Sequence, residues 1–69
     1  MNAKKQVFTT KLLNGFVYEY SNVTRVEKLI DAEGDVVEMI LYPRGLKPSA
    51  VSKHIELFNN KIKKGVCNV

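Results

Sequence analysis

His54 and Cys67 are the chain's only histidine and only cysteine, the residue types most often used in catalysis and metal binding. They stand thirteen positions apart, whereas zinc requires four such ligands, or three and a water. A cysteine–histidine nucleophile also needs a third group to orient the histidine. We therefore expect no metal, no cofactor and no catalytic residue, and hence a protein that is not an enzyme and has no small-molecule substrate. We expect His54 to lie at the edge of the core with a partly covered ring.

The basic residues are the second group with recognisable chemistry, because lysine and arginine neutralise the phosphates of nucleic acids. Residues 39–69 contain six of them and only one acid, Glu56. A helix start flanked by such cations can also hold a phosphate through its backbone N–H groups. The alternative is a solvated lysine face that only keeps the protein soluble. The candidate phosphate contacts are Arg44, Lys47, Lys53, Lys61, Lys63 and Lys64.

Aromatic side chains form the third group. Phe16, Tyr18 and Tyr20 share one face of an extended segment, since side chains alternate along a strand. If Lys11 pairs with Tyr18 across a hairpin, this face mixes aromatic rings with a cation and resembles a surface on which bases stack. We therefore add Lys11 and Tyr18 to the nucleic-acid-binding candidates. The other interpretation, which remains open, is that the three rings form the core.

Two turns organise the segments that must position these residues. Asn14-Gly15 lies between two β-rich runs, 7–13 and 16–20, and suits a two-residue turn in which both residues have positive φ. The acidic segment 31–35, which contains Gly34, separates 23–30 from 36–42. Segment 23–30 also fits helical spacing, but its β-branched residues favour a strand. Segment 36–42 is almost continuously apolar, so we expect it to be the most buried strand.

One helix is expected after Pro43 and Gly45. Pro48 suits its first turn, Ser49 is the predicted N-cap, and Gly65 can end it in a left-handed conformation. The helical period places one apolar stripe toward the sheet, with two further apolar residues that widen it. The stripe is Val51, Ile55, Phe58 and Ile62, widened by Ala50 and Leu57.

These elements predict an α+β fold: a three-stranded antiparallel β-meander packed against one C-terminal α-helix. The chain has 69 residues, so we expect one domain spanning 1–69, with frayed tails at 1–5 and 66–69. A single cysteine, no apolar leader and no run of about 18 apolar residues favour a cytoplasmic protein with no membrane partner.

The charge distribution supports two functional hypotheses. Residues 19–38 carry six acids and two bases, whereas the segments on either side are cationic and bring the net charge to +4. We expect a small non-enzymatic nucleic-acid-binding accessory or regulatory protein that uses the basic helix and loop. The alternative is a protein–protein interaction module, an inhibitor or adaptor, that uses the exposed sheet face and the acidic segment from Glu27 to Glu38. One uncovered sheet face also predicts a homodimer.

Overall fold

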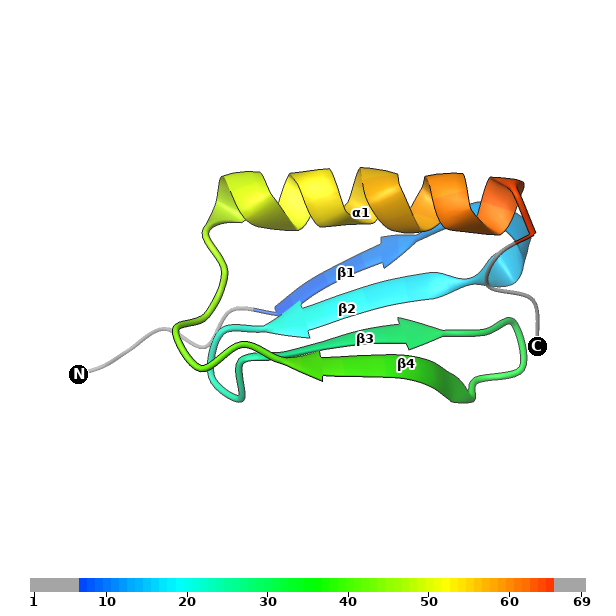
Figure 1. Ribbon diagram of the computed structural model, residues 1–69. Helices are drawn as coiled ribbons and strands as arrows, with labels where there is room; N and C mark the ends of the chain where they lie inside the picture. Colours follow the sequence, from blue (N-terminus) through cyan, green and yellow to red (C-terminus); the bar gives the residue numbers. More distant parts are fainter. Residues whose placement is uncertain (1–6, 66–69) are drawn as a thin grey trace.

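The computed structural model describes residues 7–65 and shows an antiparallel sheet followed by a helix (Figure 1). The strands pair in sequence order, β1-β2-β3-β4, each antiparallel to its neighbour. The α+β class and the C-terminal helix are therefore confirmed. The elements are β1 (Val7–Lys11), a 3-10 turn η1 (Leu13–Gly15), β2 (Val17–Ser21), β3 (Val26–Ile30), β4 (Val36–Leu41) and α1 (Pro48–Lys63).

The expected strand count is wrong, because the sheet has four strands and not three. Each of the two predicted turns closes its own hairpin, and a third turn at Ser21–Arg25 joins the two hairpins. In that turn the Arg25 backbone N–H donates to Ser21 O at 2.7 Å, and Arg25 adopts a positive φ of 61°. Of the segment 23–30, which also fits helical spacing, Val26–Ile30 forms the strand β3, and its neighbours on both sides hold it extended. Residues 23–25 belong to the turn instead, so the expected strand is shorter by three residues.

The first hairpin contains the predicted turn but has a different register. Asn14 and Gly15 have φ values of 57° and 80°, and Phe16 N–H donates to Leu13 O at 3.1 Å. Leu12 N–H, however, donates to Phe16 O at 2.7 Å, so Leu12 and Leu13 both stand opposite Phe16. This β-bulge adds one residue to the first strand. Every residue pair between the bulge and the open end of the hairpin is therefore shifted by one position from the expected register.

The shifted register moves Lys11 to the other face of the sheet. Lys11 pairs with Val17, and Tyr18 pairs with Thr10 instead. The expected pairing of Lys11 with Tyr18 is therefore wrong. A distant residue accounts for the bulge: the Leu13 N–H that leaves the ladder donates to Asn59 Oδ1 of α1 at 3.0 Å.

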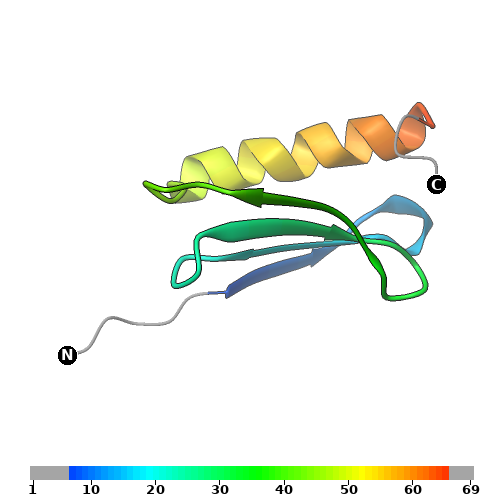
Figure 2. The same ribbon diagram turned by 60° about the horizontal axis from the view of Figure 1, so that its bottom comes forward.

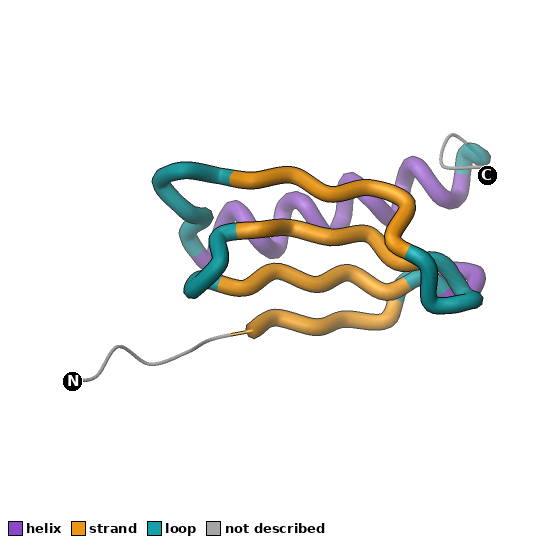
Figure 3. The backbone as a smooth tube through the Cα atoms, turned by 90° about the horizontal axis from the view of Figure 1, so that it is seen from below, coloured by secondary structure: helices purple, strands orange, loops and turns teal. Residues whose placement is uncertain are grey.

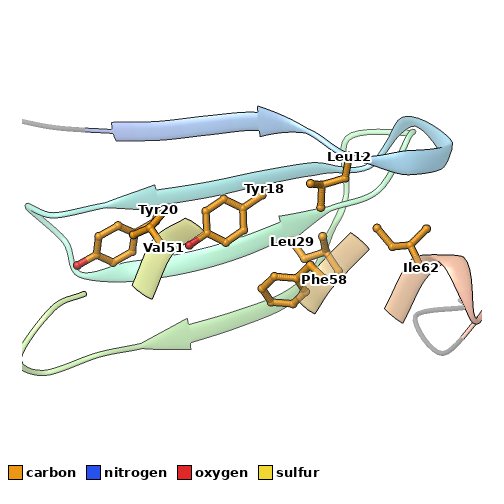
Figure 4. Packing of buried hydrophobic residues seen from close by; sticks show 7 residues of the cluster. All are labelled: Leu12, Tyr18, Tyr20, Leu29, Val51, Phe58 and Ile62. Carbon is orange, nitrogen blue, oxygen red and sulfur yellow. The ribbon is translucent and has the colours of Figure 1, made fainter. Parts of the chain in front are cut away.

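The core lies between α1 and the sheet face that carries the tyrosines. Tyr18, Tyr20 and Leu29 are fully buried, and Figure 4 shows both tyrosine rings of β2 in one cluster with Val51 and Phe58 of α1. The predicted helical stripe is confirmed, because Val51, Phe58 and Ile62 are buried and Ile55 packs against them. Leu57, by contrast, is 53% exposed and does not widen the stripe.

The opposite face of the sheet is uncovered, as the view from below shows (Figure 3). Four hydrophobic side chains are exposed on the strands, and β4 carries three of them. The prediction that 36–42 forms the most buried strand is therefore wrong: β4 is an edge strand, and its apolar residues alternate between the two faces. The exposed side chains are Val7, Val36, Met39 and Leu41.

Helix α1 lies over one face of the sheet in both views (Figures 1 and 2). It begins at Pro48, and the N-cap is Lys47, with no side-chain cap. The prediction of Ser49 as N-cap is wrong, because the chain is already helical there. The end is as predicted: Gly65 has a φ of 77°, and its N–H donates to Ile62 O at 3.0 Å.

Candidate functional site

A buried carboxylate lies between α1 and the sheet. Glu27 of β3 is only 1% exposed, yet both of its oxygens have partners. The Tyr18 hydroxyl donates to Oε2 at 2.7 Å, and the Tyr42 hydroxyl donates to Oε1 at 3.0 Å. Nδ1 of His54, on α1, lies 2.8 Å from Oε2. These three contacts supply the hydrogen bonds that a buried carboxylate requires.

The site also controls the ionisation of its tyrosines. Burial, and then the hydrogen bond to Glu27, raises the pKa of Tyr42 to about 12. The same two causes raise the pKa of Tyr18 above its ordinary value. Both hydroxyls therefore stay protonated at neutral pH and remain donors to the carboxylate.

A groove of about 440 Å³ opens beside these residues, between α1 and the sheet strands β3 and β4. Tyr42 and His54, whose rings lie 5.8 Å apart, are in its wall. Glu38 and Lys61 also line it, with Lys61 Nζ at 3.9 Å from Glu38 Oε2. The described lining residues are Glu27, Glu38, Ile40, Tyr42, His54, Leu57, Phe58, Asn60, Lys61 and Lys64.

His54 has a carboxylate partner beside this groove. Glu27 orients His54, as a carboxylate does in a catalytic triad. The described residues that line the groove, however, include no serine, threonine or cysteine to act as the nucleophile. Cys67, the other candidate weighed above, lies outside the described residues.

The predicted phosphate contacts are all exposed, and they are distributed along α1 rather than gathered at one point. Arg44 and Lys47 precede the helix, and Lys53 follows in its second turn. The helix has 16 residues, so these cations are spread over about 24 Å. Of these cations only Lys61 and Lys64, at the C-terminal end of α1, line the groove. Lys63 is not among the lining residues.

The stacking surface predicted on the aromatic strand does not form. Tyr18 has no exposed surface, and its ring lies 5.8 Å from that of Phe58. A base cannot stack on it in the folded protein. Lys11 is exposed, but the register shift places it on the uncovered face, away from the aromatic rings. Tyr18 and Tyr20 are therefore core residues, which confirms the second of the two interpretations for these two rings.

The acidic turn brings three carboxylates together, within 4.8 Å of one another. They belong to Asp31, Glu33 and Asp35. The Asp31 Oδ1 atom accepts hydrogen bonds from the backbone N–H groups of Glu33 and Asp35, both at 2.9 Å. Asp31 therefore serves the turn itself, as aspartate commonly does.

Sequence reasoning did not identify Glu27, Glu38 and Tyr42 as members of one site. It named Glu27 and Glu38 only as the ends of an acidic segment. A local signal existed for Glu27, which shares strand parity with the buried Leu29. A charged residue in a core-facing position indicates a buried polar site. The partners of Glu27 are 9, 15 and 27 residues away in the sequence, so no local sequence pattern identifies them.

No helix in the described part of the chain is long and apolar enough to span a membrane. Comparison of the sequence with protein-family models and curated proteins, and of the structure with solved structures, gives no match.

Proposed function

We propose that this protein is a non-enzymatic, nucleic-acid-binding accessory or regulatory protein that contacts phosphates through the outward face of α1 and the loop before it. One observation carries the proposal: residues 43–65 present six exposed cations and one acid, Glu56. Such a surface favours a polyanion, because each neutralised phosphate releases counterions.

The packing of α1 supports this assignment. Val51, Phe58 and Ile62 hold one side of the helix against the sheet. The helical period then turns Lys53 and Lys64 toward solvent. Of the six cations, only Lys61 has an acidic partner among the described residues, and that contact to Glu38 is long, at 3.9 Å. The remaining charges are free to meet phosphates.

Salt dependence tests the proposal. Binding of labelled oligonucleotides should weaken with a slope of log affinity against log salt of about −3 to −5. Replacing Lys53 and Lys63, which lie outside the groove, by alanine should reduce the steepness of that slope by about 1–2 units for every sequence. Lys11→Ala with Lys28→Ala is the matched control, because it removes the same charge from the uncovered sheet face.

Two results would contradict the proposal. The first is that no oligonucleotide binds more tightly than about 100 μM, the weak end of the non-specific range. The second is that the control pair changes the slope as much as the pair on α1 does.

The uncovered sheet face supports the second candidate, a protein-interaction module. Met39 and Leu41 are each 62% exposed there. The acidic segment contributes less to such a surface than its sequence suggests, because Glu27 is buried. A mainly apolar interface would bind its partner with little dependence on salt, which distinguishes the two candidates.

A further inference from the structure

Part of the groove wall is apolar. Leu57 of α1 stands at its rim with 53% of its surface exposed, and Ile40 of β4 lines it together with Phe58. A volume of about 440 Å³ lies within the range of small-ligand sites. The exposed part of Leu57 is available to a ligand that enters the groove.

Hydrogen-bond acceptors lie inside the groove. His54 Nδ1 lies 2.8 Å from the Glu27 carboxylate, which can only accept, so Nδ1 carries the proton. The Glu27 oxygens already accept from Tyr18, Tyr42 and His54. The acceptor left for a ligand is the Glu38 carboxylate, whose side chain is 34% exposed and lines the groove. A ligand that fills the groove is therefore best matched if it brings donors.

Cations stand beside these acceptors. Lys61 Nζ lies 5.3 Å from the centroid of the Phe58 ring, and Lys64 lines the same groove one helical turn from Asn60. Both lysines are exposed and belong to the cationic outer surface of α1. The groove thus combines apolar walls, internal acceptors and positive charge at its outer side.

We propose that the groove binds one unpaired nucleobase of a single strand, guanine in preference to uracil, while the adjoining phosphates lie on Lys61 and Lys64. Guanine presents two neighbouring donors, N1–H and N2–H, to which the Glu38 carboxylate can accept as a pair; uracil presents only N3–H. This edge is accessible only when the base is unpaired. The proposal rests on the nucleic-acid-binding function above and adds to it the strand type and the base.

Fluorescence anisotropy with short labelled strands tests the base preference. An oligouridine with one central guanosine should bind about tenfold more tightly than oligouridine alone, the size expected for one paired hydrogen-bond contact. Glu38→Gln should bring the two affinities together, since an amide cannot accept two hydrogen bonds side by side without presenting its N–H₂ group. Glu56→Gln is the matched control, because it removes the same charge from the exposed side of α1.

A second variant tests the apolar wall. Leu57→Ala should weaken binding of the guanosine-containing strand several-fold and leave binding of a duplex of the same length unchanged. Free guanosine monophosphate should shift the NMR methyl signals of Leu57 and Ile40 only at higher concentration than the strand does. Equal affinity for the free nucleotide would identify a mononucleotide site and overturn the assignment to a strand.

The proposal is overturned if one guanosine gives no gain, or if Glu38→Gln retains the full preference. Both failures can occur while the Lys53 and Lys63 variant still reduces the salt slope, in which case the groove is not a base site but α1 still binds phosphates. If the parent protein binds no oligonucleotide at all, both proposals are overturned.

Discussion

His54 on α1 lies 2.8 Å from Glu27 on β3, Nδ1 to Oε2, although the two residues are 27 positions apart in the sequence. This contact joins the helix to the sheet through a polar group at the edge of an otherwise apolar core. Because the carboxylate also accepts from Tyr18 and Tyr42, strands β2 and β3, the residue after β4 and the helix all meet at one side chain.

Removal of that carboxylate should be costly. Glu27→Ala leaves the Tyr18 hydroxyl buried without an acceptor, and His54 and Tyr42 lose theirs at the groove. Loss of one member of a buried, hydrogen-bonded charged group typically costs about 3–5 kcal/mol, most of the stability of a small domain. Urea unfolding followed by circular dichroism measures this loss, with Glu56→Ala as the exposed control. Equal unfolding midpoints for the two variants would show that the buried site contributes nothing.

The helix register can be tested at two adjacent residues. Phe58 is 6% exposed and Leu57 is 53% exposed. Phe58→Ala should cost about 3–5 kcal/mol because it leaves a cavity beside Tyr18. Leu57→Ala should change the free energy of unfolding by less than about 1 kcal/mol. Thermal melts of both variants provide the comparison, and the opposite order of melting temperatures would mean that the helix is rotated.

Stability should fall at high pH. The pKa of Tyr42 is raised from 10.0 to about 12 in the folded protein, so folding favours the protonated hydroxyl. This contribution is complete below about pH 10 and is lost as the pH rises toward about 12. The urea midpoint should therefore decrease between those values, and it should decrease less for Tyr42→Phe. An identical decrease for both proteins would assign the loss to other groups.

The uncovered sheet face should mediate self-association. Met39 and Leu41 are exposed on β4, opposite Lys28 and Val26 of β3. We expect a homodimer at micromolar concentration, and replacement of both exposed residues by lysine should give a monomer with an unchanged fold. Sedimentation equilibrium distinguishes the two states. A mass of 7.8 kDa for the parent chain across that range would reject the dimer.

The sequence was sufficient for the features that depend on neighbouring residues. The turns at Asn14-Gly15 and Gly34 and the apolar stripe of α1 follow from local conformational preference and helical period. The pairing partner of Lys11 did not follow, because the bulge before the first turn is stabilised by Asn59, 46 positions after Leu13. A single additional residue in one strand exchanges the two faces, so a local error in register moved a candidate binding residue to the wrong side.

The groove could not be predicted either, because it depends on contacts between residues that are distant in the sequence. The sequence showed the cations of α1, but the groove forms only where α1 lies beside β4. Glu38 was one acid among six in its segment, and only the folded chain brings it to 3.9 Å from Lys61.

The strictly sequential strand order has a consequence for how the chain folds. Each strand pairs with the one before it, so both hairpins and the turn between them close over short loops. Such local topology is associated with fast, two-state folding. The sheet, however, presents Tyr18, Tyr20 and Leu29 to water until α1, which follows it in the chain, has docked. Helix docking is therefore the step at which we expect the folding barrier to be crossed, and substitutions at Val51 or Ile62 should slow refolding more than substitutions in either hairpin turn.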